Sequence, residues 1–208
     1  MIIKIIKGSR PAAFILLLLM ISSCGFKESP ALHKLAPLPD NGGICRVAVL
    51  PFINETDYPL ADTLMYKVFV TELNKTGNIF VSQEGDVRRI YRQIKVVPGR
   101  MPFVEQLRAL AGRLGVQVVV TGNVVEMKEK ASKYSSELEP AIAVVLRIID
   151  ADTGRTLWTT YHRREGRQYR VALHFGKVNT VTALAKKIVQ EIIETWLDEG
   201  IKECGKIS

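Results

Sequence analysis

A valine-rich run at residues 115–125 places the strongest constraint on the fold of this 208-residue chain. Six of its eleven residues are Val, and its apolar residues do not alternate with polar ones. Valine favours extended backbone, and the absence of alternation is typical of a strand that is covered on both faces. The run therefore predicts a central, buried strand around which the rest of the domain is arranged.

Strand and helix patterns alternate along the remainder of the chain. In residues 59–75, apolar side chains recur every three to five positions and form one helical stripe, and residues 180–199 repeat this pattern. A turn at residues 150–154 joins two short apolar runs as a hairpin. Strands are predicted at residues 45–52, 78–82, 115–125, 141–149 and 155–163, and helices at 59–75, 86–95, 102–114 and 180–199.

These elements predict a single α/β domain over residues 45–208. Strands that are linked by helices imply parallel crossovers, whereas the hairpin adds antiparallel strands, so the sheet should be mixed. The expected order is βαβααβββα, with the helices packed mainly on one face. The polar segment 128–139 is predicted to be a loop.

Residues 1–23 have the features of an export signal. Lys4, Lys7 and Arg10 precede an apolar run at residues 11–21, which is 11 residues long, against about 20 for a membrane-spanning helix. Three of the chain's 29 Lys and Arg residues lie here, so the net charge of +8 belongs in part to this segment. Nucleic acid is therefore not an expected partner.

The sequence Ile-Ser-Ser-Cys at residues 21–24 resembles the bacterial lipobox. The resemblance implies cleavage before Cys24, which then carries a diacylglycerol and an N-acyl chain such as palmitate. Gly25 stands where aspartate would retain a lipoprotein in the inner membrane, so the implied location is the periplasmic face of the outer membrane. The alternative is an ordinary secretory signal that happens to end near a cysteine. Residues 24–44, rich in Pro and Gly, are predicted to be a short tether.

Two further cysteines form an even pair once Cys24 is committed to lipid. Cys45 precedes the first predicted strand and Cys204 follows the last predicted helix. In an oxidising compartment a disulfide between them would join the two ends of the domain and add up to about 4–5 kcal/mol. The alternative is two unpaired thiols at the termini.

Three segments in order, residues 46–56, 114–122 and 146–158, resemble a family of envelope lipoproteins. The family includes the curli secretion component CsgG, the polysaccharide export lipoprotein PelC, the synthase activator LpoB and the N-terminal domain of TolB. The resemblance implies an accessory subunit of an export system, with copies of itself or other envelope proteins as partners. The short tether and compact size favour a PelC-like role, and the alternatives are an LpoB-like activator of a peptidoglycan synthase and a TolB-like adaptor.

No catalytic or metal-binding pattern stands out in the sequence. His33, His162 and His174 lack neighbouring Cys or Glu at ligand spacing and are expected to be solvent-exposed, and the Gly-containing loops match no phosphate-binding motif. We therefore expect a protein that is not an enzyme, with no metal and no cofactor besides the acyl chains on Cys24.

Two groups of residues are candidate contact surfaces. Alternation along the second hairpin strand places Trp158, Thr160 and His162 on one face, which could be an open interface, or Trp158 could belong to the core. A set of basic residues could attract anionic lipid or an acidic glycan, or could simply be solvated. These are Arg88, Arg89, Arg92, Arg163, Arg164, Arg167 and Arg170.

Overall fold

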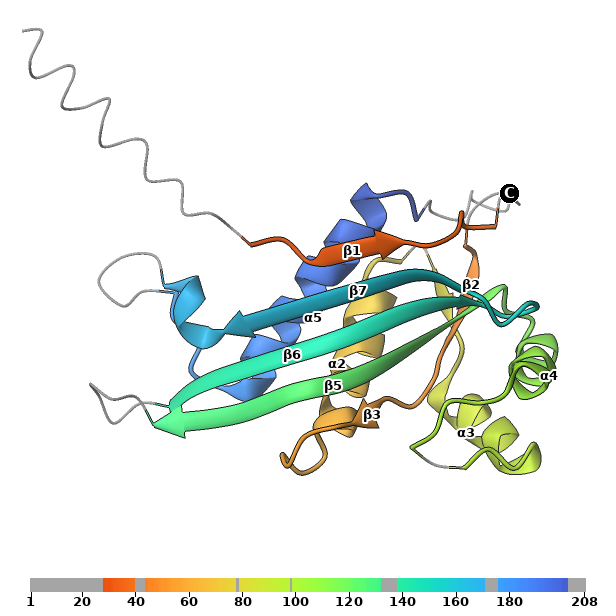
Figure 1. Cartoon of the computed structure of the whole chain (residues 1–208), viewed down its shortest axis with the longest axis horizontal. Helices are drawn as coiled ribbons and strands as arrows, with labels where there is room; N and C mark the ends of the chain where they lie inside the picture. Colours follow the sequence, from red (N-terminus) through yellow and green to blue (C-terminus); the bar gives the residue numbers. More distant parts are fainter. Residues whose placement is uncertain are drawn as a thin grey trace, which may run out of the picture.

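The structure, a computed structural model, is one α/β domain built on a seven-stranded mixed sheet (Figure 1). It describes residues 28–39, 44–77, 79–97, 99–131, 138–170 and 176–201. The strands are β1 (Ala31–Lys34), β2 (Arg46–Val49), β3 (Ile53–Asn54), β4 (Phe80–Val81), β5 (Val118–Ala131), β6 (Leu138–Asp150) and β7 (Thr156–Glu165). The helices are α2 (Ala61–Lys75), α3 (Glu84–Gln93), α4 (Val104–Leu114), α5 (Val181–Asp198) and the short 3-10 helix η1 (Gly166–Tyr169).

The sheet confirms the predicted mixture of parallel and antiparallel strands. Its order is β1-β7-β6-β5-β2-β4, with β3 also paired to β5. Strand β2 runs parallel to β4 and β5, because helices connect these strands, whereas β5, β6 and β7 are joined as antiparallel hairpins. The valine-rich strand β5 therefore lies in the interior of the sheet, as predicted.

Both faces of the sheet contribute to the core. The long helices α2 and α5 cover one face, where Phe69 and Trp196 pack with their ring centroids 5.7 Å apart. Helices α3 and α4 cover the opposite face only beside β2 and β5, over Ala48, Leu50 and Val119. Most of the helical cover is thus on one face, and the second face of β6 and β7 is left without a helix (Figure 1).

Local signals at the helix ends agree with the tertiary arrangement. Helix α5 begins after Thr180, whose Oγ1 accepts a hydrogen bond from the Ala183 N–H at 3.2 Å. Helix α4 ends at Gly115, whose φ of 63° is the left-handed conformation that glycine adopts at low cost. Among the described residues, no helix combines the length and apolar character needed to cross a bilayer.

Part of the segment predicted to be a tether is instead a strand. Strand β1 pairs antiparallel with β7, and the N–H groups of Leu35 and Ala36 then donate to the Leu157 carbonyl at 2.8 and 3.1 Å. The four-residue strand lies between Pro30 and Pro37 and shows no periodicity of its own. It forms because the outer edge of β7 offers it unpaired backbone groups.

The segment 128–139, predicted to be a polar loop, is strand at residues 128–131 and 138–139. Strand β5 continues to Ala131 and β6 begins at Leu138, with Met127 paired to Ile142. Met127 and Ile142 are buried on the helix-covered face, while the charged side chain of Glu126 faces the other side. Both strands therefore extend into the segment that was predicted to be a loop.

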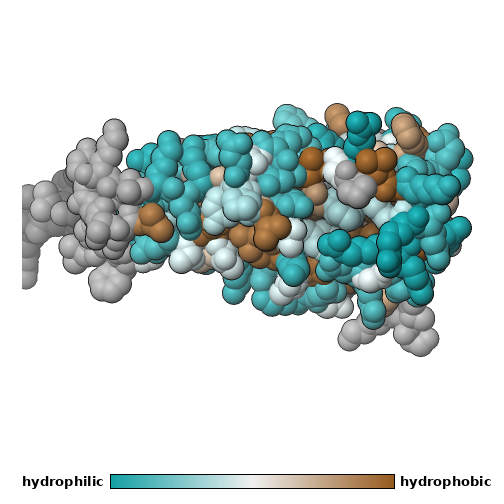
Figure 2. All heavy atoms as spheres, turned by 90° about the horizontal axis from the view of Figure 1, so that it is seen from below, coloured by the Kyte–Doolittle hydropathy of each residue, from teal (hydrophilic) through white to brown (hydrophobic). Residues whose placement is uncertain are grey.

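The surface seen from the side of β3 and β5 is mostly hydrophilic. Apolar side chains occur there in separate groups between charged and polar ones (Figure 2). On this side, the apolar side chains that stay exposed do not merge into one broad patch.

Candidate functional site

The structure buries the three side chains that were predicted to form an interface. Trp158, Thr160 and His162 expose only 3%, 0% and 3% of their surface. They do share one face of β7, but α5 packs on that face, and Trp196 Nε1 donates to Thr160 Oγ1 at 2.7 Å. The expectation of an open face at these residues is wrong, because that face supports the longest helix of the domain.

A buried cluster of charged side chains lies between β7 and α5. His162 Nε2 is 2.6 Å from Glu191 Oε2, and Arg164 Nε donates to the same oxygen at 3.0 Å. All three side chains are almost fully buried. His162 was expected to be solvent-exposed, and that expectation is also wrong.

Glu191 is held in its charged form by its neighbours. Burial on its own raises the pKa of a carboxyl group, but the hydrogen bonds from His162 and Arg164 outweigh it and hold the pKa of Glu191 below its ordinary value. The Arg164 guanidinium lies 5.8 Å from the centroid of the Tyr169 ring. Burial, followed by the nearby charge of Glu191, raises the pKa of Tyr169, so this hydroxyl stays protonated.

Arg164 also binds the first described residue of the chain. Its Nη1 donates to Glu28 Oε2 at 3.4 Å, and its Nη2 donates to the Glu28 carbonyl oxygen. Gln168 Nε2 donates to the same carboxylate at 3.4 Å. We call Glu28, Arg164 and Gln168 the N-terminal clamp, since they fix the chain just before β1 to the end of β7.

Close backbone packing positions the clamp. A β-carbon on Gly166 would lie 1.9 Å from the Val178 carbonyl oxygen, so only glycine fits where η1 begins. The N–H of Val178 donates to the Gly166 carbonyl at 3.1 Å. The hydrogen bond between Val178 and Gly166 therefore fixes the segment that precedes α5 against η1, the helix that carries Gln168.

A second charged network lies on the face of the sheet that no helix covers. Arg163 Nε donates to Glu126 Oε2 at 2.7 Å, and Arg163 also pairs with Glu165 at 3.0 Å. The hydrogen bond from Arg163 is the main reason that the pKa of Glu126 falls to about 2. Arg167 in turn pairs with Glu165 at 2.6 Å.

The predicted anion-binding arginines are divided between the two ends of the molecule, α3 and η1 (Figure 1). On α3, Arg88 pairs with Glu84 at 2.6 Å and Arg89 with Asp86 at 2.8 Å. Within the described part of the chain, Arg92 and Arg170 are exposed and form no ion pair. Most of these arginines are therefore neutralised by carboxylates, and the seven do not form one surface.

Several predictions fall on residues that the structure does not describe. Cys24, Gly25 and Cys204 lie outside the described ranges, as does His174, so lipidation, sorting and the Cys45–Cys204 disulfide stay predictions. In the described ranges, no three His, Cys, Asp or Glu side chains gather as a group that could hold a metal ion.

The sequence did not predict the buried cluster, because a glutamate such as Glu191 in an amphipathic helix is ordinarily expected to face solvent. Glu191 follows Ile188 by three residues and adjoins Ile192, and both isoleucines are fully buried. This spacing places Glu191 at the border of the apolar stripe. Two features of the sequence could have indicated the cluster. One is the charge of Glu191 at the border of the apolar stripe, and the other is the spacing of His162 and Arg164, which are two residues apart on one strand.

Solved structures share this fold at low sequence identity. A PelC variant from Paraburkholderia phytofirmans, a dodecamer, matches with a TM-score of 0.54 and 17% identity, over 80% of this chain and 96% of that one. Lipoprotein GNA1162 from Neisseria meningitidis matches with a TM-score of 0.52 and 15% identity, over 74% and 99% of the two chains. No protein-family model matches, and no curated protein does. The chain thus has the fold of these envelope lipoproteins.

Proposed function

We propose that this protein is a non-enzymatic lipoprotein that is anchored to the periplasmic face of the outer membrane and serves as an accessory subunit of an envelope export system. The observation that carries the proposal is the shared fold, which spans nearly the whole of PelC, in a chain with a lipobox-like Ile-Ser-Ser-Cys at residues 21–24. Cys24 would carry the acyl chains, and Gly25 would direct the protein to the outer membrane.

The position of β1 supports a domain that is held close to the membrane. The N-terminal clamp leaves only four steps of chain between Cys24 and Glu28, which reach at most about 14 Å when extended. An activator that must contact synthases across the periplasm would need a much longer reach. The short reach therefore favours an export accessory over the regulatory alternative.

Self-association is the second part of the proposal. PelC was solved as a dodecamer, and we propose that this chain also assembles with copies of itself beneath the membrane. The test is the mass of lipid-free residues 26–208, measured by light scattering across concentration, with and without outer-membrane lipid. A discrete large oligomer supports the proposal. A monomer under every condition contradicts it and moves the activator hypothesis ahead.

Anchoring is tested separately in cells. Cys24→Ala is expected to move the protein from the membrane fraction to the soluble fraction, because it removes the acceptor of the acyl chains. Ser22→Ala keeps a small residue in the lipobox and is the matched control. Equal membrane fractions for the two variants would contradict lipidation at Cys24.

A further inference from the structure

We infer that the domain meets the membrane in one fixed orientation, with the end formed by η1, the last residues of β5 and the first residues of β6 against anionic phospholipid headgroups. This inference rests on the proposed lipidation of Cys24. The fold alone does not indicate which surface of the domain faces the lipid, and the inference names that surface. We call this surface the η1 end, and it comprises η1, Arg170, Lys130 and Leu138.

The path of the chain defines which end is close to the lipid. Arg164 is buried and binds both the carboxylate and the carbonyl oxygen of Glu28, so the clamp fixes backbone as well as side chain. Strand β1 then continues the chain along β7, from Ala31 opposite Tyr161 to Lys34 opposite Trp158. The chain therefore enters the domain at the C-terminal end of β7. An acyl-bearing Cys24 must lie within about 14 Å of that point.

The last residues of β5 and the first residues of β6 lie beside the N-terminal clamp. Ala141 on β6 is paired with Glu165 on β7, one residue before η1. Pro140 would approach a β-carbon on Gly166 to 3.1 Å, and Lys177 Nζ is 3.9 Å from Glu139. The ends of these three strands and η1 thus lie together at one end of the domain (Figure 1).

The exposed side chains of the η1 end suit a layer of lipid headgroups. Arg170 and Lys130 are exposed and basic and form no ion pair within the described part of the chain, Arg167 is exposed but paired with Glu165, and Leu138 at the start of β6 is an exposed apolar residue. Basic residues near an anionic membrane are attracted to its surface, and an exposed leucine can enter the headgroup region. Glu28 and Glu129 are exposed acidic neighbours, but Glu28 is paired with Arg164, so Arg170 and Lys130 still outnumber the one acidic neighbour that the described residues leave without an ion pair.

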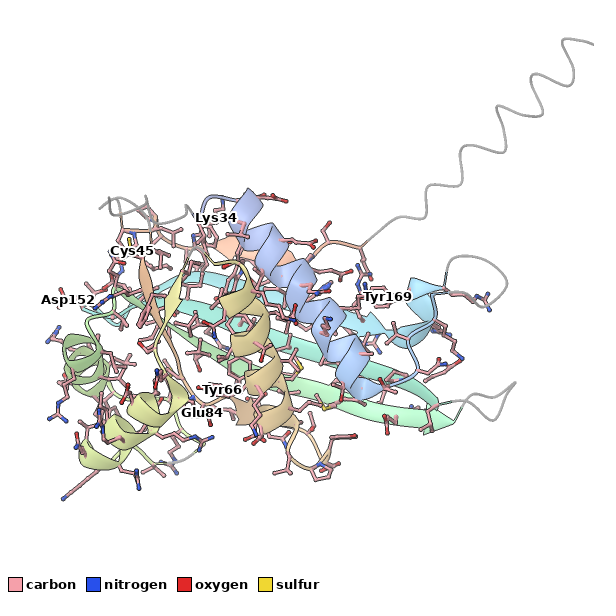
Figure 3. All side chains as sticks on the ribbon, turned by 180° about the vertical axis from the view of Figure 1, so that it is seen from behind. Lys34, Cys45, Tyr66, Glu84, Asp152 and Tyr169 are labelled. Atoms are coloured by element: carbon pink, nitrogen blue, oxygen red, sulfur yellow. The ribbon has the colours of Figure 1, made fainter. Side chains whose placement is uncertain are left out.

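The opposite end of the domain supplies an internal reference. Asp152, in the β6–β7 turn, is 85% exposed at its side chain and lies at the far end from Tyr169 (Figure 3). The ten residues of β7 separate the two positions, which corresponds to about 33 Å along the strand. That separation is larger than the range of contact quenching by a lipid-borne spin label.

The experiment uses the full-length lipoprotein in vesicles of phosphatidylethanolamine and phosphatidylglycerol that contain headgroup spin-labelled lipid. A fluorophore is attached through Arg170→Cys or through Asp152→Cys, and wild-type protein labelled in parallel gives the background from native cysteines. We expect several-fold stronger quenching at position 170 than at position 152. A flexible 20-residue spacer inserted between residues 27 and 28 adds about 25 Å of reach and should remove most of this difference.

The outcomes separate this inference from the proposed function. Flotation with the vesicles and the mass of the N-terminal peptide report lipidation independently of orientation. A lipidated, vesicle-bound protein that is quenched equally at both positions, or more strongly at position 152, overturns the orientation alone. A protein without acyl chains at Cys24 overturns the proposed anchor and this inference with it.

Discussion

Replacement of Glu191 by Gln should destabilise the domain by about 3 kcal/mol at neutral pH. Glu191 Oε2 accepts from His162 at 2.6 Å and from Arg164 at 3.0 Å, and all three side chains are almost fully buried. Hydrogen bonds to charged groups contribute about 1.5–3 kcal/mol each, and breaking a buried ion pair costs about 3–5 kcal/mol. The amide oxygen of Gln keeps one acceptor, which places the expected loss near the lower limit.

The assay is urea unfolding followed by tryptophan fluorescence, because both tryptophans, Trp158 and Trp196, are buried in the core. A loss of 3 kcal/mol lowers the urea midpoint by about 1–3 M for an m-value of 1–3 kcal/mol/M. Glu194→Gln is the matched control, since Glu194 lies one turn further along α5 and is exposed. It should change stability by less than about 0.5 kcal/mol.

The pH dependence adds a second test. The pKa of Glu191 is lowered in the folded protein, so its contribution is complete above the ordinary carboxyl value of 4.5 and is lost as the pH falls through the lower, folded pKa. The stability gap between the wild type and Glu191→Gln should therefore be widest at neutral pH and should narrow below pH 4.5. A gap that stays constant with pH, or that equals the gap for Glu194→Gln, refutes the reasoning.

Three other substitutions test the network on the uncovered face and the packing of two glycines. Glu126→Gln should lower the free energy of unfolding by about 2 kcal/mol at pH 7, because the pKa of Glu126 falls to about 2 beside the partly exposed Arg163. In thermal unfolding, the stability difference between the wild type and this variant should narrow from pH 4.5 to pH 2. A difference that does not depend on pH would argue against the pair. Gly122→Ala should destabilise the domain by about 1–3 kcal/mol in urea, because its β-carbon would lie 2.7 Å from the Leu146 side chain. Gly112→Ala, within α4 and with open space around it, should instead stabilise by up to about 1 kcal/mol, and the opposite order of the two alanine variants would contradict this account of the packing.

Local patterns predicted most of the secondary structure because they are set by short stretches of chain. Helices α2 and α5 each carry one apolar stripe, and the valine content of β5 predicted a buried strand. The helix and hairpin connections then implied a mixed sheet, which the strand order confirms. Strand β1 escaped prediction, because its four residues form a strand only through pairing with the edge of β7.

The candidate site was much less accessible from sequence. Alternation grouped Trp158 with His162 on one face of β7, but it could not say whether a helix covers that face. Glu191 reaches His162 across 29 residues of chain, and Arg164 reaches Glu28 across 136. Contacts at such separations depend on how the elements pack, and no local period encodes them.

The sequence by itself determined the types and order of the main elements, the mixed sheet and the lipobox-like segment, because each follows from residues that are near one another in the chain. Only the tertiary structure decided which faces are buried, which arginines are neutralised and where the chain enters the domain. Those outcomes depend on the free energy of burying charges, which has to be offset by partners from distant elements. For this chain, the clearest case is Glu191, which α5 brings to His162 and Arg164 on β7.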